Sequence, residues 1–138
     1  MFILKKILNS NTTSPDLSRM SINTSESYRY GDFVKLDSAG YLTKVEEGDI
    51  PTHVCCETAT GREKETLLCF PITDEMVFSA PTAENMAELK QGSRLLLIAN
   101  DSDYINAVTE NDIEGNVYLY STNGAKNAGD RVLIRFAI

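Results

Sequence analysis

Apolar and polar residues alternate along short stretches of this chain, which is the pattern of β-strands. In one stretch Phe33, Lys35 and Asp37 alternate with Val34 and Leu36. The alternation predicts a chain of short strands and turns. The expected strands lie near 33–37, 41–46, 52–58, 66–72, 75–79, 94–99, 104–109, 116–121 and 131–137.

The strand pattern occurs twice, in segments roughly sixty residues apart. This self-similarity predicts an all-β domain over 28–138, a small barrel or sandwich made of two related halves, 30–70 and 91–136. The matched residues are Tyr41 with Tyr104, Val45 with Val108, Asp49-Ile50 with Asp112-Ile113, and Phe70 with Phe136. The residues expected to point inward are Val34, Leu36, Val45, Leu95, Leu97 and Val108.

The chain before Tyr28 lacks this alternation. Ser, Thr and Asn dominate residues 9–27, and such a composition buries too little apolar surface to fold alone. We therefore expect residues 1–27 to form an extended, flexible arm that becomes ordered only against a partner. Its partner-binding residues would be the apolar anchors and lysines at its start: Phe2, Ile3, Leu4, Lys5, Lys6, Ile7 and Leu8.

One short helix is expected between the two copies, over 82–90. Thr82 is a favourable N-cap residue, strong helix formers follow it, and Gly92 is suited to end a helix. The predicted fold is thus all-β with a single short helix.

Charge and cysteine content narrow the function classes. The 138 residues carry a formal net charge of −7, which argues against a nucleic-acid partner because such partners are bound through excess Lys and Arg. The three cysteines form no even disulfide framework, so free thiols in a reducing compartment are expected. Lys5 and Lys6 interrupt the apolar start of the chain, which is too short for a signal or a membrane span. The sequence therefore predicts synthesis in a cytoplasm and no membrane partner.

The single histidine, His53, is the main candidate for catalysis or metal binding. In a strand it would share a face with Cys55, and Cys69 could complete a zinc site. The repeat argues against a zinc site. Its pairing matches His53, Cys55 and Cys69 with Asn116, Tyr118 and Arg135, so the second copy carries no zinc ligands at these positions. A small metal-dependent or cysteine hydrolase therefore remains an alternative, while the favoured prediction is a protein that is not an enzyme and holds no metal or cofactor.

Two loops resemble ligand-binding loops. Residues 110–115 have acids at alternate positions before a glycine, as in a calcium loop, but Ser121 stands where the bidentate acid belongs. We expect a solvated loop there, and calcium binding is left open. Residues 124–129 have the glycine spacing of a phosphate loop, but Asp130 and Arg131 follow instead of Lys and Ser or Thr, which favours a hairpin turn.

The predicted strand at 116–121 places two tyrosines side by side. Val117 and Leu119 share one face, and Tyr118 and Tyr120 share the other. If Val117 and Leu119 face the core, the tyrosines form an exposed partner-binding surface, because tyrosine is enriched at protein interfaces. A sheet covered on both faces is the open alternative.

Two segments carry a family resemblance. They are Gly31-Asp32-Phe33-Val34-Lys35-Leu36-Asp37-Ser38-Ala39-Gly40 and Gly129-Asp130-Arg131-Val132-Leu133-Ile134-Arg135-Phe136. Together with the polar N-terminal segment, they resemble the capsid decoration, or cement, proteins of tailed bacteriophages.

The resemblance implies a structural virion protein that binds the outside of the capsid and stabilises the shell. Its partner would be the major capsid protein, it would be a homo-oligomer with a trimer favoured, and its location would be the capsid surface. The resemblance carries no catalytic residues. A β-barrel module of a phage tail or another virion part is the remaining alternative.

Overall fold

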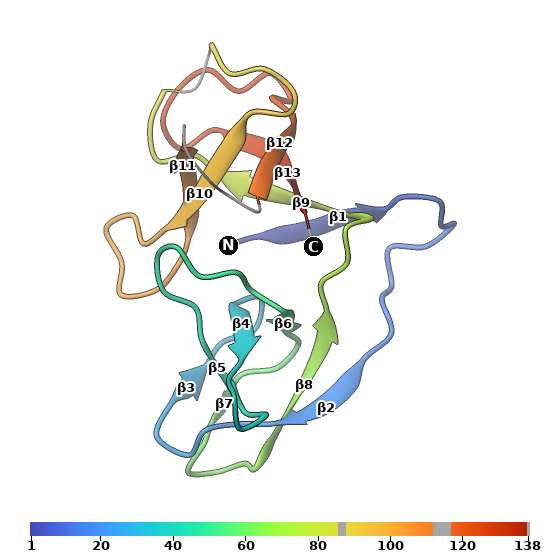
Figure 1. The fold of residues 1–138 in the computed structure, drawn as a ribbon, viewed down its shortest axis with the longest axis vertical. Helices are drawn as coiled ribbons and strands as arrows, with labels where there is room; N and C mark the ends of the chain where they lie inside the picture. The colour runs from blue at the N-terminus through green and yellow to red at the C-terminus, as the bar shows by residue number, and fades with distance from the viewer. Residues whose placement is uncertain (86–87, 112–116, 138) are drawn as a thin grey trace. The chain divides into compact units, whose positions relative to one another are not determined.

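The computed structural model describes residues 1–85, 88–111 and 117–137. These residues form strands and turns and contain no helix (Figure 1). The chain divides into two compact units, described separately below. Unit 1 comprises residues 1–13, 46–48 and 73–138, and unit 2 comprises residues 14–45 and 49–72.

Unit 2 is built on a five-stranded antiparallel sheet in the order β2-β8-β6-β4-β5. Its strands are β2 (Ser18–Ser21), β4 (Phe33–Leu36), β5 (Leu42–Lys44), β6 (His53–Cys55) and β8 (Thr66–Pro71). A separate two-stranded ladder joins β3 (Ser27–Tyr28) to β7 (Ala59–Thr60). The buried core of this unit consists of Ile22, Tyr28, Val34, Leu42, Cys55, Ala59, Leu67 and Cys69.

Unit 1 is built on a six-stranded antiparallel sheet in the order β1-β9-β13-β12-β10-β11. Its strands are β1 (Ile3–Ile7), β9 (Met76–Pro81), β10 (Arg94–Ile98), β11 (Ala107–Glu110), β12 (Val117–Ser121) and β13 (Arg131–Phe136). Phe78 and Phe136 meet edge to face in its core, with ring centres 5.7 Å apart, an arrangement that aromatic pairs favour.

The two sheets share one strand order. If β1 is left out and the strands of each unit are numbered along the chain, the strands of both sheets lie side by side in the order first, fifth, fourth, second, third. Matching hydrogen bonds accompany this order. Gly31 N–H donates to Cys55 O, and Gly92 N–H donates to Leu119 O, each at 2.8 Å. Parallel bridges also join the residue just after the first strand to the third strand, between Ile22 and Leu42 and between Thr82 and Val108. The named strands of neither sheet close into a barrel.

These bonds correct the residue pairing beyond the first matched strand. Gly31 still matches Gly92, but Val108 corresponds to Leu42, and not to Val45. Asp112-Ile113 lies outside the described residues. One expected core residue is also wrong: Leu36 is 38 % exposed, because β4 ends there and the chain enters its turn. The other expected core residues are buried: Val34, Val45, Leu95, Leu97 and Val108.

Cys55, opposite Cys69, corresponds to Leu119, opposite Ile134. The sequence predicted Tyr118 and Arg135 as the matches of Cys55 and Cys69, so both matches are shifted by one residue. Phe70 corresponds to Arg135 instead of Phe136. A shift of one residue moves a side chain to the other face of the sheet, so this correction changes which residues are compared across the repeat.

The expected helix over 82–90 is not present in the described part of that segment; residues 86 and 87 lie outside it. Thr82, the expected N-cap, is held by the strands instead. Its N–H donates to Asp130 O at 2.9 Å, and its hydroxyl donates to the same carbonyl at 3.0 Å. The hydroxyl is thus used to extend the end of β9 and not to accept a helix amide.

The segment expected as an arm contributes strands to both units. Residues 3–7 form β1, which pairs with β9, and residues 18–21 form β2, which pairs with β8. Met20 is the only apolar residue of β2, so the ladder with β8 supplies the interactions that its composition lacks. Residues 1–27 therefore contain β1, β2 and the first residue of β3, while the flexibility of this segment in the free protein stays a prediction.

Candidate interaction surface

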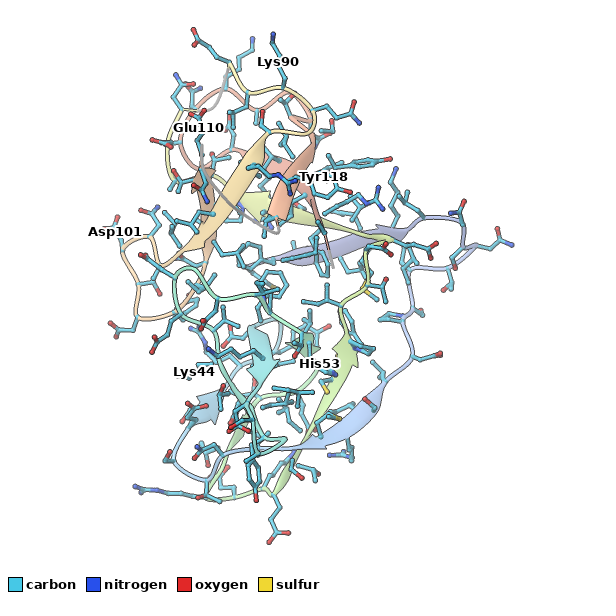
Figure 2. All side chains as sticks on the ribbon, in the orientation of Figure 1. Lys44, His53, Lys90, Asp101, Glu110 and Tyr118 are labelled. Carbon is cyan, nitrogen blue, oxygen red and sulfur yellow. The ribbon has the colours of Figure 1, made fainter. Side chains whose placement is uncertain are left out.

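One face of the unit 1 sheet gathers tyrosine and cationic side chains. On β12, Val117 and Leu119 are buried, whereas Tyr118 and Tyr120 are half-buried on the opposite face. Figure 2 labels Tyr118 in this strand. Arg94 on β10 lies directly opposite Tyr118, and Arg135 on β13 lies opposite it on the other side. Cross-strand partners point to the same face of a sheet, so these side chains emerge together.

Two cations lie over the tyrosine rings. Lys6 Nζ is 5.1 Å from the ring centre of Tyr120, and Arg135 Cζ is 5.8 Å from the ring centres of both Tyr118 and Tyr120. These distances are within the range of cation–π attraction. We call the surface formed by Lys6, Arg94, Tyr118, Tyr120 and Arg135 the tyrosine–cation face.

Backbone carbonyls and a serine hydroxyl orient the two arginines of β13. Arg135 donates through Nε to Asp74 O at 2.8 Å, and its Nη2 donates to the same oxygen. Arg131 donates through Nε to Ser79 Oγ at 2.6 Å and through Nη2 to Ser79 O at 3.0 Å and to Met1 O. Burial lowers the pKa of Arg131. These contacts hold the guanidinium groups in set orientations before any partner binds.

The corresponding positions of unit 2 are apolar. Arg94, Tyr118 and Arg135 correspond to Phe33, Val54 and Phe70, which are 4 %, 5 % and 7 % exposed. The same strand positions therefore carry buried apolar side chains in one unit and polar side chains that reach solvent in the other. The polar character of the unit 1 face is thus not a requirement of the strand arrangement.

The residues expected to bind a partner near the N-terminus divide into several environments. Phe2 is buried, and Leu4, Ile7 and Leu8 are half-buried, so they serve mainly the packing of the protein itself. Ile3, Lys5 and Lys6 are exposed, and of these Lys6 joins Tyr120. Sequence reasoning singled out Lys6, Tyr118 and Tyr120 but missed Arg94 and Arg135. Arginines alternate with apolar residues in 131–136, and this alternation is the signal in the sequence that places Arg135 on the tyrosine–cation face.

In the described part of the chain, His53 lies in no group of side chains that could hold a metal. It is half-buried, burial lowers the pKa of its imidazole, and Nδ1 lies 2.8 Å from Thr52 Oγ1. No group of three or more His, Cys, Asp or Glu side chains suited to hold a metal occurs within residues 1–85, 88–111 and 117–137. A neutral imidazole bonded to a neighbouring hydroxyl is an ordinary strand side chain.

The cysteines occupy packing positions. Cys55 and Cys69 are buried opposite one another, where unit 1 has Leu119 and Ile134, and Cys56 is half-buried. Burial raises the pKa of all three thiols. A nucleophilic cysteine needs the reverse, because the thiolate is the reactive form. The three thiols are free.

The two loops that resemble ligand loops have different outcomes. Residues 112–116 of the calcium-like segment lie outside the described residues. In the glycine-rich segment, the Asp130 carboxylate accepts the N–H groups of Lys126 and Asn127, both at 3.0 Å. The loop amides that would bind a phosphate therefore bind the chain's own carboxylate, and the segment is the turn between β12 and β13.

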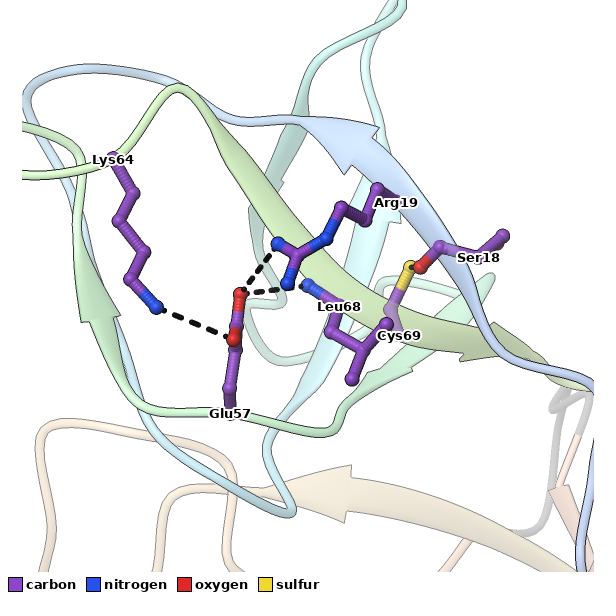
Figure 3. Close-up of polar contacts among 6 residues, drawn as sticks. All are labelled: Ser18, Arg19, Glu57, Lys64, Leu68 and Cys69. Carbon is purple, nitrogen blue, oxygen red and sulfur yellow. Dashed lines mark hydrogen bonds and ion pairs between the residues drawn. The ribbon is translucent and has the colours of Figure 1, made fainter.

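The carboxylate of Glu57 joins several segments of unit 2. Glu57 Oε1 accepts from Leu68 N–H at 3.0 Å and from Arg19 Nη1 at 3.2 Å, while Oε2 accepts from Lys64 Nζ at 3.2 Å (Figure 3). These contacts, above all the Leu68 amide, lower the pKa of Glu57. Glu57 thereby connects β2, β8 and the loop between β7 and β8.

Comparisons with known protein families, with curated proteins and with solved structures found no match. The described residues also include no helix with the length and apolar character needed to cross a membrane.

Proposed function

We propose that this chain is a structural protein of a tailed-phage virion that binds the outside of the capsid, stabilises the shell and catalyses no reaction. The observation that carries the proposal is the tyrosine–cation face. Tyrosine combines a large apolar area with a polar tip, and tyrosine and arginine are enriched where proteins bind one another. The face therefore has the composition of a protein-binding surface.

The segments that resemble decoration proteins support the proposal through their backbone geometry. Gly31, Gly40 and Gly129 have φ angles of 87°, 86° and 90°. Such values are readily adopted only by glycine. The glycines of these two segments thus mark turns that this strand arrangement needs.

Under this proposal the protein is a sandwich-like β-module made of two related halves. Its partner is the major capsid protein, it acts as a homo-oligomer with a trimer favoured, and it resides on the capsid surface after synthesis in the host cytoplasm. A symmetric lattice presents many equivalent sites, so modest single contacts add up to firm attachment.

The test is sedimentation of the purified protein with empty shells and, separately, with tails of the phage that encodes it. We expect saturable binding to shells and a higher melting temperature for the decorated shells. Binding to tails alone would favour the alternative virion module, and binding to neither would contradict the proposal. Deletion of residues 1–27 is a poor variant for this test, since it removes strand partners from both β8 and β9.

A further inference from the structure

Two cations share one aromatic ring on the tyrosine–cation face. Lys6 Nζ and Arg135 Cζ lie 5.1 Å and 5.8 Å from the ring centre of Tyr120. Both groups are cations, so the surface around this ring is positively charged. An anion placed beside this ring would be attracted by both cations.

The contacts that Arg135 makes in the described part of the chain use only part of its guanidinium. Nε and Nη2 donate to Asp74 O, and the group lies over both tyrosine rings, so these contacts orient the side chain and do not involve Nη1. An arginine that is already oriented loses less entropy on binding a carboxylate. Arg94, opposite Tyr118 and exposed, extends the positive charge along the same row of the sheet.

The charge of the whole chain selects among anions. The net charge of −7 repels a long polyanion such as a nucleic acid, whose phosphates extend well beyond one sheet face. A short segment with a few carboxylates places its charge on the face alone. The apolar surfaces of Tyr118 and Tyr120 also suit the stems of protein side chains better than a phosphate backbone.

We propose that the tyrosine–cation face binds a short acidic segment of the partner protein, with its Asp or Glu carboxylates on Lys6, Arg94 and Arg135. This inference rests on the proposed function, since it names the chemistry that the capsid surface presents to this protein. From β10, which carries Arg94, to β1, which carries Lys6, the row spans four strand spacings, about 19 Å, which about six extended residues can cover.

A peptide of about twelve glutamates, twice that span, is the probe. Titration into the isotope-labelled full chain, followed by NMR, should shift the amide signals of β1, β10, β12 and β13. Lys6→Gln and Arg135→Gln should each weaken binding by about tenfold, equal to about 1.4 kcal/mol. Arg135→Lys keeps the charge but loses the fork of donors, so it should fall between wild type and Arg135→Gln.

Lys90→Gln and Lys126→Gln are the matched controls, because both lysines are exposed in unit 1 outside the face. They should leave the affinity unchanged, whereas equal losses in all variants would show non-specific attraction and overturn the inference. Absence of binding, shifts confined to other strands, or tighter binding of polyphosphate would also overturn it. The peptide titration uses no shells, so its result is independent of the shell-binding test. A protein that binds shells but not the peptide would refute this inference alone. A protein that binds the peptide but not shells would refute the proposed function alone.

Discussion

The ammonium group of Lys6 lies 5.1 Å from the ring centre of Tyr120, although β9 and β13 separate their strands in the sheet. The two long side chains reach toward one another across the polar face. This contact attaches the N-terminal strand to β12 as well as to its ladder partner β9.

A double-mutant cycle measures the contact. Lys6→Met keeps the aliphatic stem and removes the charge, and Tyr120→Leu removes the ring. We expect a coupling free energy of about 0.5 kcal/mol in urea unfolding, the size of an exposed cation–π contact. Lys5→Met paired with Tyr120→Leu is the control, and equal coupling in both cycles would show that Lys6 has no special contact.

Leu36 and Leu97 occupy matching strand positions but differ in burial, at 38 % and 2 % exposed. Leu97→Ala should therefore reduce the free energy of unfolding by about 2–5 kcal/mol, through lost burial and the cavity left behind. Leu36→Ala should cost about 0.5 kcal/mol or less, as at other surface sites. Similar losses for the two variants in chemical denaturation would contradict the burial difference.

The sequence was sufficient to predict the all-β class and the alternation of β12 and β13, but it left the pairing register uncertain. Val54, Cys55 and Cys56 follow one another without a polar residue between them, so a period of two does not decide which of them face the core. The strand at 18–21 was missed because β8, a distant segment, provides its ladder. Tyrosine pairing was visible in the sequence, whereas the convergence of Lys6 and Arg135 on Tyr120 depends on the order of four strands.

Acid should weaken the contacts of Glu57. Its pKa is lowered in the folded state by the Leu68 amide, Lys64 and Arg19, so the ionised form contributes stability above the unfolded pKa of about 4.3. That contribution should be lost as pH falls below about 4.3 and through the lower folded pKa. Glu57→Gln should reduce stability by up to about 1 kcal/mol at neutral pH.

The pH profile of unfolding checks this assignment, since Glu57→Gln should flatten the acid limb of the stability curve. Glu63→Gln, at an exposed position of the same unit, is the matched control and should leave the limb unchanged. An acid limb that is identical in wild type and Glu57→Gln would show that other carboxylates cause it.

Alkali should weaken the protein through its buried thiols. Burial raises the pKa of Cys55, Cys56 and Cys69, so the folded state keeps them protonated after the unfolded thiols begin to ionise near pH 8.5. Stability should therefore be full below that pH and fall as pH rises above it. The reaction of the three cysteines with a thiol reagent at pH 7.5 checks this. In the folded protein the reaction should be slow, and Cys56, which is half-exposed, should react fastest; after unfolding all three should react rapidly. Rapid reaction of Cys55 in the folded state would contradict this.

The central claim is that the tyrosine–cation face attaches the protein to capsid shells, and a binding isotherm on purified shells tests it most directly. Tyr118→Ala combined with Tyr120→Ala should weaken binding by about tenfold or more, as expected for aromatic residues central to an interface. Tyr30→Ala combined with Tyr41→Ala changes two exposed tyrosines of unit 2 and should leave the isotherm unchanged. Full affinity of the Tyr118 and Tyr120 variant for shells, with the fold intact by circular dichroism, would contradict the account.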